Sequence, residues 1–146
     1  MTTTDIDLLK LENQVCFALA VASRSVIALY RPILEPLGLT HPQYLVMLAL
    51  WEESPRSVKG LGEALQLEPA TLSPLLKRLE ASGLVRRVRS TVDERLLEIT
   101  LTAEGAALRE QAEEIPPRVM SELGMSAEEL TRMREMLHSV IAAATD

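Results

Sequence analysis

The sequence predicts a mainly helical fold that carries one small β-hairpin. Apolar residues recur at spacings of three and four along most of the 146 residues, which is the period of an amphipathic helix. One segment departs from that period, because Leu97, Ile99 and Leu101 alternate with polar residues as in a half-buried strand. The chain is 47% apolar and 25% charged, so it can bury a core, and we expect one domain over residues 1–146.

The first expected element is a long helix over residues 8–36, which ends near Pro32 and Pro36. One apolar stripe at helical spacing predicts it: Leu8, Leu11, Val15, Leu19, Ala22, Val26, Leu29 and Ile33. This stripe is too long for the core of a small domain to cover alone. We therefore expect the helix to pack against a second copy of the chain.

Three shorter helices are predicted next. The first begins at His41–Pro42, with Thr40 as its N-cap and a proline at an early helical position. Two more follow, separated by a break near Leu67–Glu68, and Gly83 closes the second of them. Pro74 lies inside that last helix, where it removes one backbone hydrogen bond and should bend the axis.

A charged hairpin follows these helices, with strands VRRVRS and LLEITL joined by the polar tip TVDER. Three helices and a hairpin are the order of a winged helix-turn-helix, which we assign to residues 42–101.

Two helices finish the chain. One opens after Thr102 and is halted by Pro116–Pro117, and the other opens with a capping box from Ser126 to Glu129. Residues 103–144 and 8–36 then form a helical dimerisation region.

Positive charge is concentrated in and just before the hairpin. The chain has a net charge of −6, yet residues 77–95 hold six basic residues and three acidic ones, which gives +3 there and −9 elsewhere. An acidic body with one basic module is compatible with a double-stranded DNA partner. A solvated surface on an ordinary hairpin would show the same charges. The basic residues of this segment are Lys77, Arg78, Arg86, Arg87, Arg89 and Arg95.

The order of elements assigns roles to the candidate DNA-binding residues. On the recognition helix, early residues reach base edges and later basic ones reach phosphates. At the hairpin tip, Arg95 can enter a minor groove while Asp93 steadies its guanidinium, although a surface ion pair of little consequence is the alternative. The candidates are Thr71, Ser73, Lys77, Arg78, Arg87, Asp93 and Arg95.

Other classes of protein fit the sequence poorly. The uninterrupted apolar runs, such as Leu45–Trp51, are far shorter than the roughly 20 residues that cross a bilayer. The acidic N-terminus does not match a signal peptide, so we expect a cytoplasmic protein without membrane association. The single cysteine, Cys16, fits a reducing compartment, and its distance in sequence from His41 and His138 predicts no metal site and no cofactor.

Three segments carry a family resemblance: LENQVCFALAVASRSVIALYRPILEPLGLTHPQYLVMLALWEE, TLSPLLKRLEASGLVRR and DERLLEITLT. Over Leu8 to Ile141 the chain resembles the organic hydroperoxide-sensing repressors of the multiple antibiotic resistance regulator (MarR) family. The resemblance implies a homodimeric repressor that holds its operator when reduced. It also implies that an organic hydroperoxide oxidises Cys16 and releases the DNA, which derepresses a neighbouring gene for a thiol peroxidase.

The resemblance also implies which groups surround the thiol. Family members commonly place tyrosines where Ala20 and His41 stand here, and they share Tyr30. Tyr30 and Cys16 are fourteen residues apart, a rise of about 21 Å on one helix, so Tyr30 would reach the thiol from an antiparallel second copy. His41 would act there either as an imidazolium or as a neutral hydrogen-bond donor, and the alternative is that it is only an exposed residue at the start of a helix, before Pro42.

The single cysteine also limits the oxidised product. Without a second cysteine, the sulfenic acid of Cys16 can condense only with a separate molecule such as a small cellular thiol, giving a mixed disulfide. We further expect an apolar pocket around the sulfur, although plain core packing explains the same residues equally well. These residues are Phe17, Leu19, Val21, Val46, Leu50 and Trp51.

Two rival functions use the same residues differently. In the first, a phenolic or lipid-like ligand releases the DNA and Cys16 only packs. In the second, the chain is a thiol peroxidase, but Arg24 and Arg31 have no catalytic motif around them and the basic hairpin would be unexplained. We therefore expect a DNA-binding regulator and not an enzyme.

Overall fold

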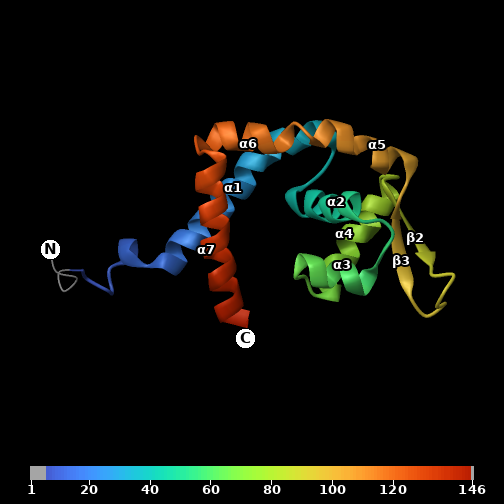
Figure 1. Ribbon diagram of the computed structural model, residues 1–146, viewed down its shortest axis with the longest axis horizontal. Coiled ribbons are helices and arrows are strands. Elements are labelled where there is room, and N and C mark those ends of the chain that lie inside the picture. The colour runs from blue at the N-terminus through green and yellow to red at the C-terminus, as the bar shows by residue number, and fades with distance from the viewer. Residues whose placement is uncertain (1–5, 146) are drawn as a thin grey trace.

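The structure is a computed structural model that describes residues 6–145. It consists of a winged helix-turn-helix lobe and a helical arm (Figure 1). The lobe combines three helices with a three-stranded antiparallel sheet, and the arm is built from the first helix and the last ones. The predicted fold class, mainly α with a small β-hairpin wing, is confirmed.

The first helix, α1 (Val15–Leu34), begins at Val15, so the prediction that it begins at Leu8 was wrong. The preceding segment forms only the short 3-10 helix η2 (Leu11–Asn13). There the Gln14 side-chain amide donates to the carbonyl oxygens of Leu8 at 2.6 Å and Lys10 at 3.1 Å. Side-chain hydrogen bonds of this kind compete with the backbone bonds of a helix, which explains the later start.

The second helix, α2 (His41–Glu52), begins where the sequence predicts. The 3-10 turn η3 (Glu35–Leu37) separates it from α1, and Gly38 closes that turn at a φ of +70°, which glycine adopts without a Cβ clash. The Thr40 hydroxyl accepts the Gln43 backbone N–H at 3.3 Å, and the Gln43 side chain accepts the Thr40 N–H at 2.9 Å. This reciprocal capping box fixes the start of α2.

The helix-turn-helix consists of α3 (Val58–Leu65) and α4 (Pro69–Ala81), and the predicted break between them is confirmed. The short strand β1 (Arg56–Ser57), which precedes α3, was not predicted, because two residues are too few to show alternation. Helix α4 continues through Pro74 despite the lost backbone bond, since its apolar face is held in the core. That face consists of Leu72, Leu75, Leu76 and Leu79.

The wing is formed by β2 (Val85–Arg89) and β3 (Leu97–Leu101), as predicted. The strand order is β1-β3-β2, and both pairings are antiparallel, with Arg87 opposite Ile99. Ile99 is fully buried while its neighbours along β3 are half-buried, so the strand fixes one face of the wing against the core.

The C-terminal region contains α5 (Ala103–Ala112), α6 (Ile115–Leu123) and α7 (Ala127–Thr145), although the sequence predicted only two helices there. Pro116–Pro117 halt α5 indirectly, because they occupy the first turn of α6, where a missing N–H removes no helical bond. In Figure 1, α5 runs along the top of the lobe, α6 continues over α1, and α7 crosses α1.

The predicted capping box at the start of α7 is confirmed. The Ser126 hydroxyl accepts the Glu129 N–H, and the Glu129 carboxylate accepts the Ser126 N–H, both at 3.1 Å. The Ser126 hydrogen bonds hold the pKa of the Glu129 carboxyl below its usual value.

The hydrophobic core lies within the lobe and where α1, α5 and α6 meet it. Its largest fully buried side chains are Leu34, Met47, Leu50, Leu61, Leu72, Leu76, Leu79, Ile99, Val46 and Val85. Neither the first half of α1 nor any part of α7 contributes a buried residue. The arm therefore projects from a core that does not cover it.

Candidate functional site

Cys16 lies in the first turn of α1, and it is exposed. Its apolar neighbours on the same helix are also exposed, Phe17 by 43% and Val21 by 37%. In Figure 1 this end of α1 extends away from the lobe. Within one chain, Cys16 is therefore accessible to a dissolved oxidant and does not fill space in the core.

Tyr30 and His41 come together where α1 meets α2. Their ring centroids are 4.8 Å apart with an interplanar angle of 60°, and the Tyr30 ring also lies 5.9 Å from that of Tyr44. Burial raises the pKa of both tyrosines and lowers the pKa of His41. Burial therefore favours the neutral imidazole of His41, which can donate one hydrogen bond.

Tyr44 was not singled out from the sequence. It lies three residues after His41 on α2, a spacing that places two side chains on the same helix face. That spacing is the signal that could have identified it.

The thiol and the aromatic cluster are distant within one chain. Cys16 and Tyr30 are separated by fourteen helical residues, or about 21 Å of axial rise. The apolar pocket expected at the sulfur does not form inside the chain, because Val46 and Leu50 are core residues with exposures of 0% and 1%. They face the interior of the lobe, whereas Cys16 lies on the uncovered arm.

A groove of about 650 Å³ lies between α1 and α7. Its surface is almost entirely apolar, and His41 is one of its lining residues. The lining residues are Leu19, Ala22, Ser23, Val26, Ile27, His41, Leu123, Leu130, Met133, Leu137, Val140 and Ile141. The groove thus joins the aromatic cluster to the uncovered faces of both arm helices.

The arm exposes an unusual amount of apolar surface. On α7, Met136 is 71% exposed and Val140 is 47% exposed, and on α1 Val15 is 70% exposed. By length and composition alone, Val15–Leu37 is a segment that could cross a membrane, contrary to the expectation that the chain has no such segment. The same apolar surface is also what a helical subunit interface requires.

The candidate base-reading and phosphate-binding residues lie on α4. Thr71, Lys77 and Arg78 are exposed, and Ser73 is half-buried. Glu68, the N-cap of α4, makes no side-chain capping bond, and no acidic residue lies in the first turn. The N-terminal half of α4 presents small polar side chains.

Arg87 is engaged within the chain. Its Nη2 and Nε donate to the Glu80 carboxylate at 3.0 and 3.2 Å, and its backbone N–H donates to the same carboxylate at 3.3 Å. Hydrogen bonds from Arg87 hold the pKa of Glu80 below its usual value. This pair connects β2 to α4, so the geometry favours a role for Arg87 in positioning the wing.

At the wing tip, Arg95 and Asp93 form the expected ion pair. Arg95 Nε donates to Asp93 Oδ1 at 3.1 Å and Nη2 donates to Oδ2 at 3.3 Å. The hydrogen bonds from Arg95 lower the pKa of Asp93. The Arg95 side chain is 90% exposed, so the carboxylate orients a guanidinium that remains available to a ligand.

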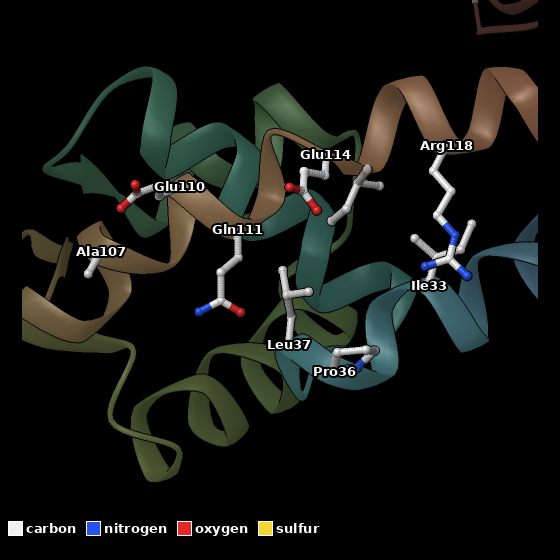
Figure 2. A pocket seen from close by; sticks show the side chains of 9 residues that line it. Ile33, Pro36, Leu37, Ala107, Glu110, Gln111, Glu114 and Arg118 are labelled. Carbon is white, nitrogen blue, oxygen red and sulfur yellow. The ribbon is translucent and has the colours of Figure 1, made fainter.

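A second cavity, of about 580 Å³, lies where η3 and the end of α1 meet α5 and α6 (Figure 2). Ile33, Pro36 and Leu37 form its apolar side, while Glu110 and Glu114 come from the other side. Arg118 reaches from α6 toward Ile33. None of the predicted site residues lines this cavity.

Within residues 6–145, no three His, Cys, Asp or Glu side chains are grouped so that they could hold a metal ion.

Comparisons with known proteins agree with this geometry. A family model described as transcriptional regulator SarA/Rot matches residues 28–112. The chain is 44% identical over 135 residues to the organic hydroperoxide resistance transcriptional regulator of Bacillus subtilis (strain 168), covering 92% of each chain. It is 38% identical to reduced AbfR bound to DNA, with a TM-score of 0.77 and coverage of 93% of this chain and 95% of that one.

A more distant solved structure shows the fold alone. Wild-type MarR (apo form) from E. coli is 24% identical, with a TM-score of 0.70, and the match covers 87% of this chain and 96% of that one. The similar proteins are thus DNA-binding transcription regulators and not enzymes.

Proposed function

This chain belongs to the family of the SarA/Rot proteins and the organic hydroperoxide resistance transcriptional regulator and shares the winged-helix fold of MarR, and from that membership we propose that it represses transcription until an organic hydroperoxide oxidises Cys16. The observation that carries the proposal is an exposed thiol on an apolar helix face that the chain itself does not cover. The relative's printed role in organic hydroperoxide resistance supports the same trigger. The regulated gene is then one whose enzyme destroys organic hydroperoxides, a thiol peroxidase.

The active form is a homodimer built from the two arms. Exposed apolar residues on α1 and α7 border the groove between them, and burying them is the main favourable term for association. A twofold interface places the same face of both copies in contact, so α1 of one copy lies against α1 of the other. Burial in this interface would also explain why the segment Val15–Leu37 is long and apolar enough to cross a membrane.

An antiparallel pairing of the two α1 helices brings the thiol and the aromatic cluster together. The axial separation of about 21 Å within one helix is cancelled when the helices run in opposite directions, so Cys16 of one copy approaches Tyr30 and His41 of the other. The Tyr30 hydroxyl and the neutral His41 imidazole would each donate a hydrogen bond to the thiolate. Both donors stabilise the reactive form of the thiol.

The redox step has two parts. The Cys16 thiolate attacks the terminal oxygen of the hydroperoxide, the O–O bond breaks, and the alkoxide leaves with a proton as an alcohol, so the sulfur is oxidised to sulfenic acid. A small cellular thiol then attacks that sulfur, an S–S bond replaces the S–O bond, and water leaves. The product is a mixed disulfide at Cys16, because the chain has one cysteine.

Oxidation at this interface would act on DNA binding through dimer geometry. A bulkier sulfur between the two arms shifts the subunits, and the recognition helices then no longer fit half-sites one DNA turn apart, about 34 Å. Because the coupling is reciprocal, bound operator disfavours the oxidised form by the same factor.

The DNA contacts are divided between α4 and the wing. Thr71 and Ser73 would reach base edges, while Lys77 and Arg78 would neutralise phosphates. Arg95, oriented by Asp93, would enter the adjacent minor groove.

The test is operator release in the wild type and in Cys16→Ser. Fluorescence anisotropy of a labelled duplex should fall when cumene hydroperoxide is added to the wild type, and dithiothreitol with fresh duplex should restore binding. Cys16→Ser should stay bound under the same treatment. Release of Cys16→Ser by the peroxide would show that the thiol is not the sensor.

The groove favours one second candidate, release by a phenolic or lipid-like ligand. Its volume lies within the range of small-molecule sites, and its lining is apolar. In that case salicylate or a fatty acid would release both the wild type and Cys16→Ser without any peroxide, and reductant would have no effect.

A further inference from the structure

The tip of the wing carries an apolar residue that thiol sensing does not use. Val92 is 95% exposed, the most exposed large hydrophobic residue among those that the structure describes. It does not lie in a loose loop. Ser90 is buried, and its Oγ accepts the backbone N–H groups of Val92 at 3.2 Å and Asp93 at 3.3 Å. The tip is thus a hydrogen-bonded turn that presents a branched aliphatic side chain to solvent.

The charged groups around this apex are Arg89, Asp93, Arg95 and Glu94, and the Glu94 side chain is exposed. The Asp93 carboxylate is paired with Arg95, whose side chain is 90% exposed. Arg89 Nη1 donates to the backbone carbonyl of Glu94 at 3.0 Å, which braces the other side of the turn. An occupant of this surface must therefore accept a guanidinium and an aliphatic group side by side.

We propose that Val92 is a DNA-contacting residue whose methyl groups pack on the deoxyribose walls of the minor groove that Arg95 enters. A minor groove offers both required features, since its phosphates attract the guanidinium and its sugar walls are apolar. This contact would favour a narrow minor groove, as in A·T-rich DNA, because only there do both sugar walls lie within reach of one side chain. The inference rests on the proposed wing contact but not on oxidation of Cys16.

Salt dependence separates an apolar contact from an ionic one. Binding that releases counterions weakens with salt in proportion to the number of neutralised phosphates, whereas packing of methyl groups releases none. Val92→Thr keeps the branched shape and replaces one methyl group with a hydroxyl, and we expect it to weaken binding roughly fivefold for two wings at every salt concentration. Arg95→Gln should instead lower the slope of log affinity against log salt.

The experiment uses the full-length reduced protein and a duplex enriched from a random-sequence library with the wild type. Hydroxyl-radical cleavage first maps the part of this duplex that the wing protects. The affinity is then measured by anisotropy over a series of salt concentrations, on this duplex and on a shorter one that ends before the protected part. Val88→Thr is the matched control, because it adds the same hydroxyl to the same wing, at a residue of β2 that is 43% exposed. Thermal unfolding of each variant establishes that the fold is retained.

The expected result is a loss for Val92→Thr with an unchanged salt slope on the long duplex, no loss on the short duplex, and wild-type affinity for Val88→Thr. Wild-type affinity of Val92→Thr on the long duplex would overturn the inference, as would an equal loss on both duplexes or in both valine variants. An unchanged slope for Arg95→Gln would instead refute the wing contact itself.

Discussion

Gly105→Ala should destabilise the protein, although helix propensity alone predicts the opposite. Gly105 lies in the first turn of α5, where alanine is favoured over glycine by about 1 kcal/mol. A Cβ at this position would overlap the carbonyl oxygen of Leu84 and lie 3.3 Å from a methyl group of Leu101. The overlapped atom belongs to the backbone, so the clash cannot be relieved by rotating a side chain.

The hydrogen bonds around Gly105 make the cost larger. Its N–H donates to the Thr102 hydroxyl at 3.0 Å, its carbonyl accepts from Trp51 Nε1 at 2.9 Å, and the Leu84 carbonyl itself accepts from the Thr102 N–H. Overpacking of this kind costs about 3 kcal/mol, and moving α5 away weakens these bonds by about 1 kcal/mol each. The clash therefore outweighs propensity, with a net loss of about 2–5 kcal/mol.

Urea unfolding followed by circular dichroism measures this loss, and the emission of Trp51, the only tryptophan, reports its bond to Gly105. Ala106→Gly is the matched control, because it changes the propensity of the neighbouring exposed position by about 1 kcal/mol and causes no overlap. A Gly105→Ala protein as stable as the wild type would refute the reasoning from close packing.

Three further predictions follow from other elements. Gln66 is the described non-glycine residue with a positive φ, 54°. The variant Gln66→Gly should therefore raise the free energy of unfolding by about 0.5–1 kcal/mol, measured from the urea midpoint. A lower free energy of unfolding would argue against backbone strain at this position. Arg87→Gln removes the bond from Arg87 to Glu80 and should lower the melting temperature, but it should not change the slope of log DNA affinity against log salt concentration. A slope that falls as it does in Arg95→Gln would instead show that Arg87 contacts a phosphate. Burial lowers the pKa of His41 from its ordinary 6.5, so the unfolded chain binds more protons than the folded chain as the pH falls through this region. The free energy of unfolding should therefore fall as the pH drops, and His41→Gln should make that fall less steep. Parallel profiles of melting temperature against pH for the wild type and the variant would refute this.

The sequence predicts those elements whose signals are local. The start of α2 follows from Thr40 and Pro42, and the start of α7 follows from Ser126 and Glu129, because signals of this kind span only a few residues. The wing follows from strict alternation in β3.

The errors come from competition between local and longer-range effects. The apolar stripe continues before Val15, but the side-chain amide of Gln14 binds backbone carbonyls there and prevents the helix. A pair of prolines such as Pro116–Pro117 is compatible both with the end of one helix and with the first turn of the next, and the sequence alone does not distinguish the two.

The candidate site is predictable only as a set of residues. Cys16 is identified by its family motif, but its exposure depends on how much of α1 the lobe covers, which no local pattern determines. The pairing of Arg87 with Glu80 likewise depends on the packing of β2 against α4. The convergence of Tyr30, His41 and Tyr44 depends on how α1 and α2 pack.

The most direct test of the central claim measures two quantities in one sample, the fraction of operator released and the fraction of Cys16 modified. Aliquots taken during a cumene hydroperoxide titration, with a small thiol present, are divided between anisotropy and intact-protein mass spectrometry. We expect release to rise in step with sulfenic acid or mixed disulfide at Cys16, and both to reverse with reductant. Release while Cys16 stays unmodified, or a stable complex with Cys16 fully modified, would contradict the account.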